Sequence, residues 1–77
     1  MPSAYVLINC TLGSDNEIIS RLREIPVVIQ AYQVYGAYDI IVRAAARTVE
    51  ELQQALKSDI RSLDSIVSTV TLVTKEI

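Results

Sequence analysis

A chain of 77 residues with 51% hydrophobic side chains and a formal net charge of −2 has room for one small domain, which we expect to span residues 1–77. Its 7 Lys and Arg residues are scattered, which excludes a basic stripe for direct nucleic-acid binding and a polybasic membrane surface. The single cysteine excludes an internal disulfide, and the absence of histidine removes the commonest general base and metal ligand, so we expect no cofactor and no metal.

The first predicted elements are a strand and a helix. Residues 4–10 are rich in β-branched and aromatic side chains, in a run too short for a buried helix. Ser14 and Glu17 have the spacing of a capping box, in which the serine accepts from the third helical amide and the glutamate reaches back. The helix is expected over residues 15–24, and Pro26 ends it because proline disfavours helical geometry at the residue before it.

Two strand-like runs then meet at a Tyr-Gly-Ala-Tyr connection. Residues 27–34 and 39–45 have high β-propensity and the link between them is short, so we expect an antiparallel hairpin. Gly36 supplies the positive φ angle that such a turn needs. Asp39 follows the turn, where aspartate often bonds local amides, and this turn role is one interpretation of the residue.

The last predicted elements are a second helix and a strand. Thr48 and Glu51 form a second capping box. Gln53 and Lys57 fall on the side of the helix that is expected to face water. Residues 66–74 are strongly β-prone and predict the final strand. The predicted buried stripe of the helix consists of Val49, Leu52, Leu56 and either Ile60 or Leu63.

The predicted element order is β-α-β-β-α-β. Right-handed crossovers around a central hairpin give an α+β, ferredoxin-like fold, in which a four-stranded antiparallel sheet carries both helices on one face. Alternate residues of a strand point to opposite faces, yet neither alternate set in residues 4–10, 27–34 or 66–74 is wholly polar. The helix-free face is therefore expected to be covered by a second copy, in a homodimer or in a larger ring built from dimers.

The hairpin region resembles a known family. Tyr32, Gly36, Tyr38 and Asp39 match a signature in which an apolar or aromatic strand is followed by Gly-x-Tyr/Phe-Asp and a second apolar strand. This signature is found in the effector-binding domain of the Lrp/AsnC regulators, often called RAM for regulation of amino-acid metabolism. Full-length members carry an N-terminal helix-turn-helix domain, and we expect none here because only three residues precede the first predicted strand. The chain therefore resembles a stand-alone form, which we expect not to bind DNA by itself.

The end of the chain extends this resemblance. The family's last strand typically begins with Thr-x-Thr or Thr-x-Ser after a Leu-Pro-Gly-Val link. The residues that fit this pattern are Leu63, Ile66, Thr69 and Thr71. Asp64 and Ser65 replace the Pro-Gly pair, and Ser68 stands where an Arg is common.

The resemblance implies a dimeric α+β barrel that assembles further, from a tetramer up to a decameric ring. It also implies that a small effector, usually an amino acid, binds between dimers beside the hairpin, with help from the last strand. The ligand-binding residues carried over from the family are Gly36, Ala37, Tyr38, Asp39, Ser68, Thr69 and Thr71. Backbone amides around the glycine would bind the effector's carboxylate, Asp39 its ammonium group, and threonine hydroxyls would complete a polar rim.

Three functions remain open at this point. The first is a non-catalytic module that binds an amino acid and forms oligomers. The second is an assembly partner that joins a full-length Lrp/AsnC regulator and changes its oligomeric state. The third is a small enzyme of the dimeric α+β-barrel type, against which the absence of histidine counts.

We expect neither a catalytic residue nor a membrane span. Cys10 is interpreted as a small buried hydrophobic residue, because no histidine is present to activate it. The N-terminal apolar run is too short for a signal peptide or a membrane span. Together with the single cysteine, this favours a cytoplasmic location.

Overall fold

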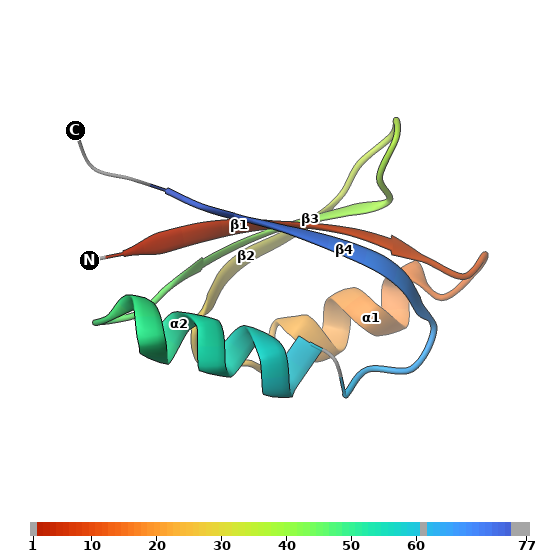
Figure 1. Ribbon diagram of the computed structural model, residues 1–77. Coiled ribbons are helices and arrows are strands. Elements are labelled where there is room, and N and C mark those ends of the chain that lie inside the picture. The colour runs from red at the N-terminus through yellow and green to blue at the C-terminus, as the bar shows by residue number, and fades with distance from the viewer. Residues whose placement is uncertain (1, 61, 75–77) are drawn as a thin grey trace.

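The computed structural model describes residues 2–60 and 62–74. Within these residues the chain runs through strand, helix, strand, strand, helix and strand, as Figure 1 shows. The turn η1 is π-helical and continues the second helix directly. The elements are β1 (Ser3–Cys10), α1 (Asp15–Leu22), β2 (Val28–Gln33), β3 (Ile40–Ala45), α2 (Val49–Ala55), η1 (Leu56–Ile60) and β4 (Ile66–Val73).

The strands form one antiparallel sheet in the order β2-β3-β1-β4. β1 is a central strand, with Ile8 opposite Ile40 of β3 on one side and Thr69 of β4 on the other. Both helices cover the same face of the sheet, and the other face carries no helix from the described residues (Figure 1). The predicted α+β, ferredoxin-like βαββαβ fold is therefore confirmed.

The core lies between the sheet and the helices. Alternate residues of β1 point toward the helices, and Ala4, Val6 and Ile8 are at most 1% exposed. Fully burying a large aliphatic side chain stabilises the fold by about 1.5–3 kcal/mol, so the sheet and the helix layer depend on each other. The largest fully buried side chains are Ile8, Leu22, Ile40, Leu52, Val6 and Val42.

The predicted capping box of α1 is wrong. Ser14 has helical backbone angles (φ −97°, ψ 0°) and makes no side-chain cap bond. Its hydroxyl donates instead to the Thr11 carbonyl at 2.6 Å, inside the preceding turn. Glu17 forms an ion pair with Arg21 at 3.5 Å instead of reaching back. The helix also ends at Leu22 rather than at residue 24, because the chain tightens into turns before the proline.

The second capping box is confirmed in its threonine half, since the Glu51 amide donates to Thr48 Oγ1 at 3.1 Å. The predicted burial of Val49 is wrong, because this residue lies in the first turn and is 40% exposed. The helix widens into η1 after α2. The Ser58 hydroxyl donates to the Gln54 carbonyl at 2.6 Å and competes there with a regular helical amide bond. The buried residues of α2 and η1 are Leu52, Leu56 and Ile60.

β1 begins one residue earlier than predicted, at Ser3, and the other three strands are slightly shorter than predicted. β2 does not fill the expected range 27–34, and both Val34 and Asp39 lie in the connection, where the Val34 amide donates to the Asp39 carbonyl at 2.9 Å. β4 ends at Val73, one residue before the predicted end. A bulge in β2 leaves Ile29 53% exposed, because the extra residue interrupts the alternation of the strand.

Candidate functional site

The connection between β2 and β3 rises from the sheet on its helix-free side (Figure 1). Gly36 has a φ angle of +141°, which confirms the predicted positive value. A Cβ atom at this position would meet no atom within 4 Å, so the backbone conformation alone calls for glycine. Gly36 and Ala37 are exposed at the tip, and Tyr38 is half-buried near the base.

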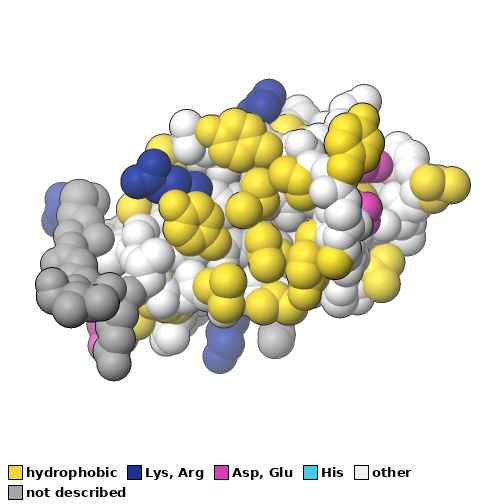
Figure 2. Space-filling view, turned by 90° about the horizontal axis from the view of Figure 1, so that it is seen from above, with side chains coloured by type: hydrophobic (Ala, Val, Ile, Leu, Met, Phe, Trp, Pro, Cys, Tyr) yellow, Lys and Arg dark blue, Asp and Glu magenta, His cyan; other side chains and the backbone are white. Residues whose placement is uncertain are grey.

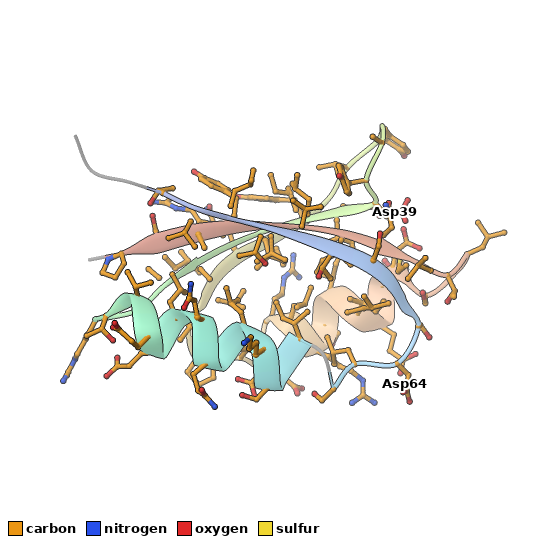
Figure 3. The ribbon with its side chains drawn as sticks, in the orientation of Figure 1. Asp39 and Asp64 are labelled. Atoms are coloured by element: carbon orange, nitrogen blue, oxygen red, sulfur yellow. The ribbon has the colours of Figure 1, made fainter. Side chains whose placement is uncertain are left out.

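Asp39 ties this connection to the end of β1. Its Oδ2 atom accepts a hydrogen bond from the Cys10 amide at 3.0 Å, and the Asp39 amide donates to the Ile8 carbonyl at 3.0 Å. The carboxylate thus bonds an amide of a different strand rather than one in its own turn. Figure 3 shows Asp39 at the end of the sheet, and Asp64 on the helix side in the loop before β4. The bond from the Cys10 amide restrains the orientation of the carboxylate, which keeps further lone pairs able to accept.

Ser68 lies on the helix-free face, where Asn9 Nδ2 donates to its hydroxyl at 3.3 Å. Asn9 pairs with Ser68 across the β1–β4 ladder, and Asp39 lies on the other side of the same end of β1. Two strand spacings of about 4.8 Å each therefore separate Ser68 from the hairpin. The polar groups at this end of the sheet are neighbours, but they do not form one closed pocket within the subunit.

Thr69 and Thr71 point to the opposite side of the sheet from Ser68. Their pairing partners in β1 are Ile8 and Val6, which belong to the helix-facing core. Both threonines line a groove of about 340 Å³ between β4 and the second helix. The residues that line this groove, called the β4 groove below, are Val6, Gln53, Leu56, Lys57, Ile60, Thr69, Thr71 and Val73.

The predicted ligand-binding residues therefore fall into separate places on one subunit. Residues 36–39 lie at the hairpin, Ser68 lies on the helix-free face, and Thr69 and Thr71 lie in the β4 groove. Sequence reasoning missed Gln53 and Lys57, which do face water but also border this groove. The sequence did indicate this position, because both residues flank the apolar stripe of the second helix. Residues that flank such a stripe lie at the edge of the surface that the helix buries.

The helix-free face exposes an apolar surface. Figure 2 looks onto this side of the molecule and shows hydrophobic side chains gathered across its middle. Tyr5 of β1 and Tyr32 of β2 are 39% and 49% exposed, and Leu72 of β4 is 53% exposed. A sheet face in contact with water would carry mainly polar side chains at these positions. The surface formed by Tyr5, Leu7, Tyr32, Ile41, Val70 and Leu72 is called the open face below.

The other groups to consider are the Cys10 thiol and the acidic side chains. The predicted burial of Cys10 is confirmed only in part, because this residue packs against the core but is half-buried. Desolvation raises the pKa of its thiol, which keeps it protonated and poorly nucleophilic. Within residues 2–60 and 62–74, no group of three or more His, Cys, Asp or Glu side chains could hold a metal ion. In the same part of the chain, no helix is both long and apolar enough to cross a membrane.

Comparison with known proteins identifies relatives that share the sequence and the fold. Residues 3–77 match the family model of the Lrp/AsnC ligand binding domain. The hypothetical protein PHS023 from Pyrococcus horikoshii is 32% identical in its crystal structure, with a TM-score of 0.93, and the match covers 100% of this chain and 93% of that one. TTHA0845 from Thermus thermophilus is 30% identical with a TM-score of 0.93, over 100% of this chain and 96% of its own.

A curated relative is longer than this chain. The HTH-type transcriptional regulator FL11 from Pyrococcus furiosus is 29% identical over 70 residues, which are 91% of this chain and 46% of the regulator. The chain thus spans about half the length of the curated relative that it matches.

Proposed function

Because the chain belongs to the Lrp/AsnC ligand-binding domain family, we propose that it is a non-catalytic module that binds an α-amino acid and assembles through its sheet. The observation that carries the amino-acid assignment is the fixed Asp39 carboxylate. Its Oδ2 atom is held by the Cys10 amide at 3.0 Å, at the base of an exposed hairpin. A carboxylate that is oriented before the ligand arrives loses little entropy on binding, and it forms a charge-assisted bond with an ammonium group.

The proposed pocket draws on two subunits. In one subunit, the hairpin rises on the helix-free side of the sheet, while Thr69 and Thr71 line the β4 groove on the helix side. A single small effector cannot contact both places, because the sheet lies between them. We therefore infer that residues 36–39 of one subunit close over the β4 groove of a neighbour. The glycine turn would offer amides to the effector's carboxylate, and Asp39 would bind its ammonium group.

Homodimerisation through the open face is the second part of the proposal. A stable interface of standard size buries about 800 Å² per partner, which is about 15% of the 5307 Å² surface of this subunit. The open face crosses every strand of the described sheet and contains two half-exposed tyrosines, the residue type most suited to interfaces. Packing two open faces together would produce the predicted dimeric α+β barrel, and dimers would then assemble into rings of four to ten subunits.

Isothermal titration against the twenty amino acids tests the ligand assignment. The informative variant is Asp39→Asn, because its amide oxygen can still accept from the Cys10 amide while the negative charge is lost. Loss of one charge-assisted bond of about 1.5–3 kcal/mol predicts at least tenfold weaker binding. Asp64→Asn is the matched control, since Asp64 is exposed at the same end of the molecule but outside the hairpin.

The proposal predicts binding of at least one amino acid by the wild-type chain and by Asp64→Asn, and much weaker binding by Asp39→Asn. Circular dichroism checks that both variants remain folded. Absence of heat from all twenty amino acids, or equal affinity in the Asp39 and Asp64 variants, would contradict the assignment.

A second candidate function is assembly with a longer regulator of the same family. It is favoured by the match to FL11, in which the aligned residues are 46% of a protein described as a transcriptional regulator. An open face of the same fold could be shared between a short and a long chain. The test is to refold this chain together with such a regulator and to separate the products by size-exclusion chromatography. Recovery of homo-oligomers alone, with no mixed species, would count against the idea.

A further inference from the structure

The β4 groove exists because neither helix covers the last strand. Ile66 is partly covered at the start of β4, and the residues that follow it in the strand are exposed. The groove has a volume of about 340 Å³, close to the lower end of the range of about 300–1,000 Å³ for small-molecule pockets. Its floor is apolar, with Val6, Leu56 and Ile60 at most 7% exposed. This size and floor suit a small molecule with a short branched apolar tail.

The rim of the groove is polar and carries a positive charge. Lys57 is the one charged residue that lines it among the described residues, and none of the lining residues is acidic. The ion pair between Arg21 and Glu17 is the only one in the part of the chain that the structure describes, so Lys57 has no carboxylate partner there. Thr69 and Thr71 add hydroxyls on the opposite wall. The rim is therefore complementary to a negative group, and among the described residues of the same subunit it has no carboxylate for a positive one.

The π-helical turn places this charge at the groove. Leu56, Lys57 and Ile60 all belong to η1 and all line it. The Ser58 hydroxyl bond to the Gln54 carbonyl at 2.6 Å accompanies the widened turn. π-Helical turns are rare and occur frequently at functional sites, and here η1 forms the end of the second helix. The irregular turn thus supplies an observation independent of the groove's shape.

We propose that the β4 groove binds a small monocarboxylate without an ammonium group, of the 2-oxo acid class, with its carboxylate on Lys57 and the hydroxyls of Thr69 and Thr71. Its branched apolar tail lies on the floor formed by Val6, Leu56 and Ile60. This inference rests on the proposed function only in that both sites use the two threonines. An amino acid needs the Asp39 of a neighbouring subunit for its ammonium group, whereas the deaminated analogue needs the β4 groove alone.

The test is isothermal titration of the full 77-residue chain with 4-methyl-2-oxopentanoate, with its neutral methyl ester and with L-leucine. The affinity for the oxo acid is expected to be at least about tenfold higher than the affinity for its ester, because the ester lacks one charge-assisted hydrogen bond. Lys57→Met should weaken oxo-acid binding by a similar factor, and Lys57→Arg should keep it within a few-fold because the positive charge stays. Arg47→Gln is the control, since it removes an exposed positive charge that does not line the groove.

Several results would overturn the inference. Equal affinity of wild type and Lys57→Met for the oxo acid would remove Lys57 from the site. Binding of L-leucine that depends on Asp39, with no binding of the oxo acid, would leave the proposed function standing and reject this inference. If no probe binds and Lys57→Met changes the sedimentation coefficient, a second copy of the chain covers the groove, and the groove is not a ligand site.

Discussion

Replacing Ser65 with glycine is expected to stabilise the protein. Ser65 is the one non-glycine residue with a positive φ angle in the described part of the chain, at +74°. It stands where the family pattern Leu-Pro-Gly-Val has its glycine. Left-handed backbone costs an L-residue about 1–2 kcal/mol, and the greater freedom of glycine in the unfolded chain offsets about 0.4–1 kcal/mol of the relief. The net gain is between about 0 and 1.6 kcal/mol, with a midpoint of about 0.8 kcal/mol. The backbone bond from the Thr11 amide to the residue 65 carbonyl, 2.8 Å long, is kept.

Thermal unfolding followed by circular dichroism measures this gain. A change of 1 kcal/mol shifts the Tm of a domain of 60–100 residues by about 4–8 °C, so Ser65→Gly should raise the Tm by about 2–8 °C. The protein concentration must be fixed, because assembly makes the Tm depend on it. Ser65→Ala keeps the left-handed strain and should give no gain. Ser62→Gly adds glycine where φ is not positive and should lower the Tm. A Tm for Ser65→Gly at or below that of wild type would refute the reasoning.

Two further predictions concern the open face and the helix caps. Leu72→Lys places a charge in the proposed dimer interface and should give an 8.5 kDa monomer in analytical ultracentrifugation. Val49→Lys, at an exposed position on the second helix, should leave the oligomer intact. Thr48→Ala should lower the free energy of unfolding by about 1 kcal/mol, because it removes the acceptor of the Glu51 amide. Ser14→Ala removes no helix cap and should lower the free energy of unfolding clearly less. Denaturant titration of both variants measures the difference.

Local patterns were sufficient to predict the order of the elements and most of their positions. The Thr48 cap could be predicted from the sequence, because its hydroxyl has no competing partner among the described residues and accepts the expected bond. The identical pattern at Ser14 failed because the hydroxyl reaches the Thr11 carbonyl first, and a sequence motif does not rank two acceptors. The turn η1 was missed for a related reason. Leu52, Leu56 and Ile60 are buried both in a regular helix and in one that widens, so their spacing does not distinguish the two.

The sequence names candidate site residues, but it does not show where all of them lie on the subunit. Strand alternation by itself puts Thr69 and Thr71 on one face and Ser68 on the other, and the structure follows this rule. The partner of Asp39 was not predictable, because the Cys10 amide is distant in sequence and meets the carboxylate only through the pairing of β1 with β3. The β4 groove depends on how far the second helix reaches across the sheet, which is a property of packing and not of any local pattern.

The two edges of the sheet differ in a way that links binding to assembly. The β2 edge is protected, since a bulge interrupts it and Arg23 donates to the Ala31 carbonyl at 3.4 Å. The β4 edge has neither a charge nor a proline between Ile66 and Val73. Uncharged, uncovered edge strands favour pairing with other chains, and proteins retain them where something covers them. β4 presents Leu72 to the open face and Thr71 to the β4 groove. The proposed subunit contact and the proposed ligand contact are therefore one residue apart on the same strand.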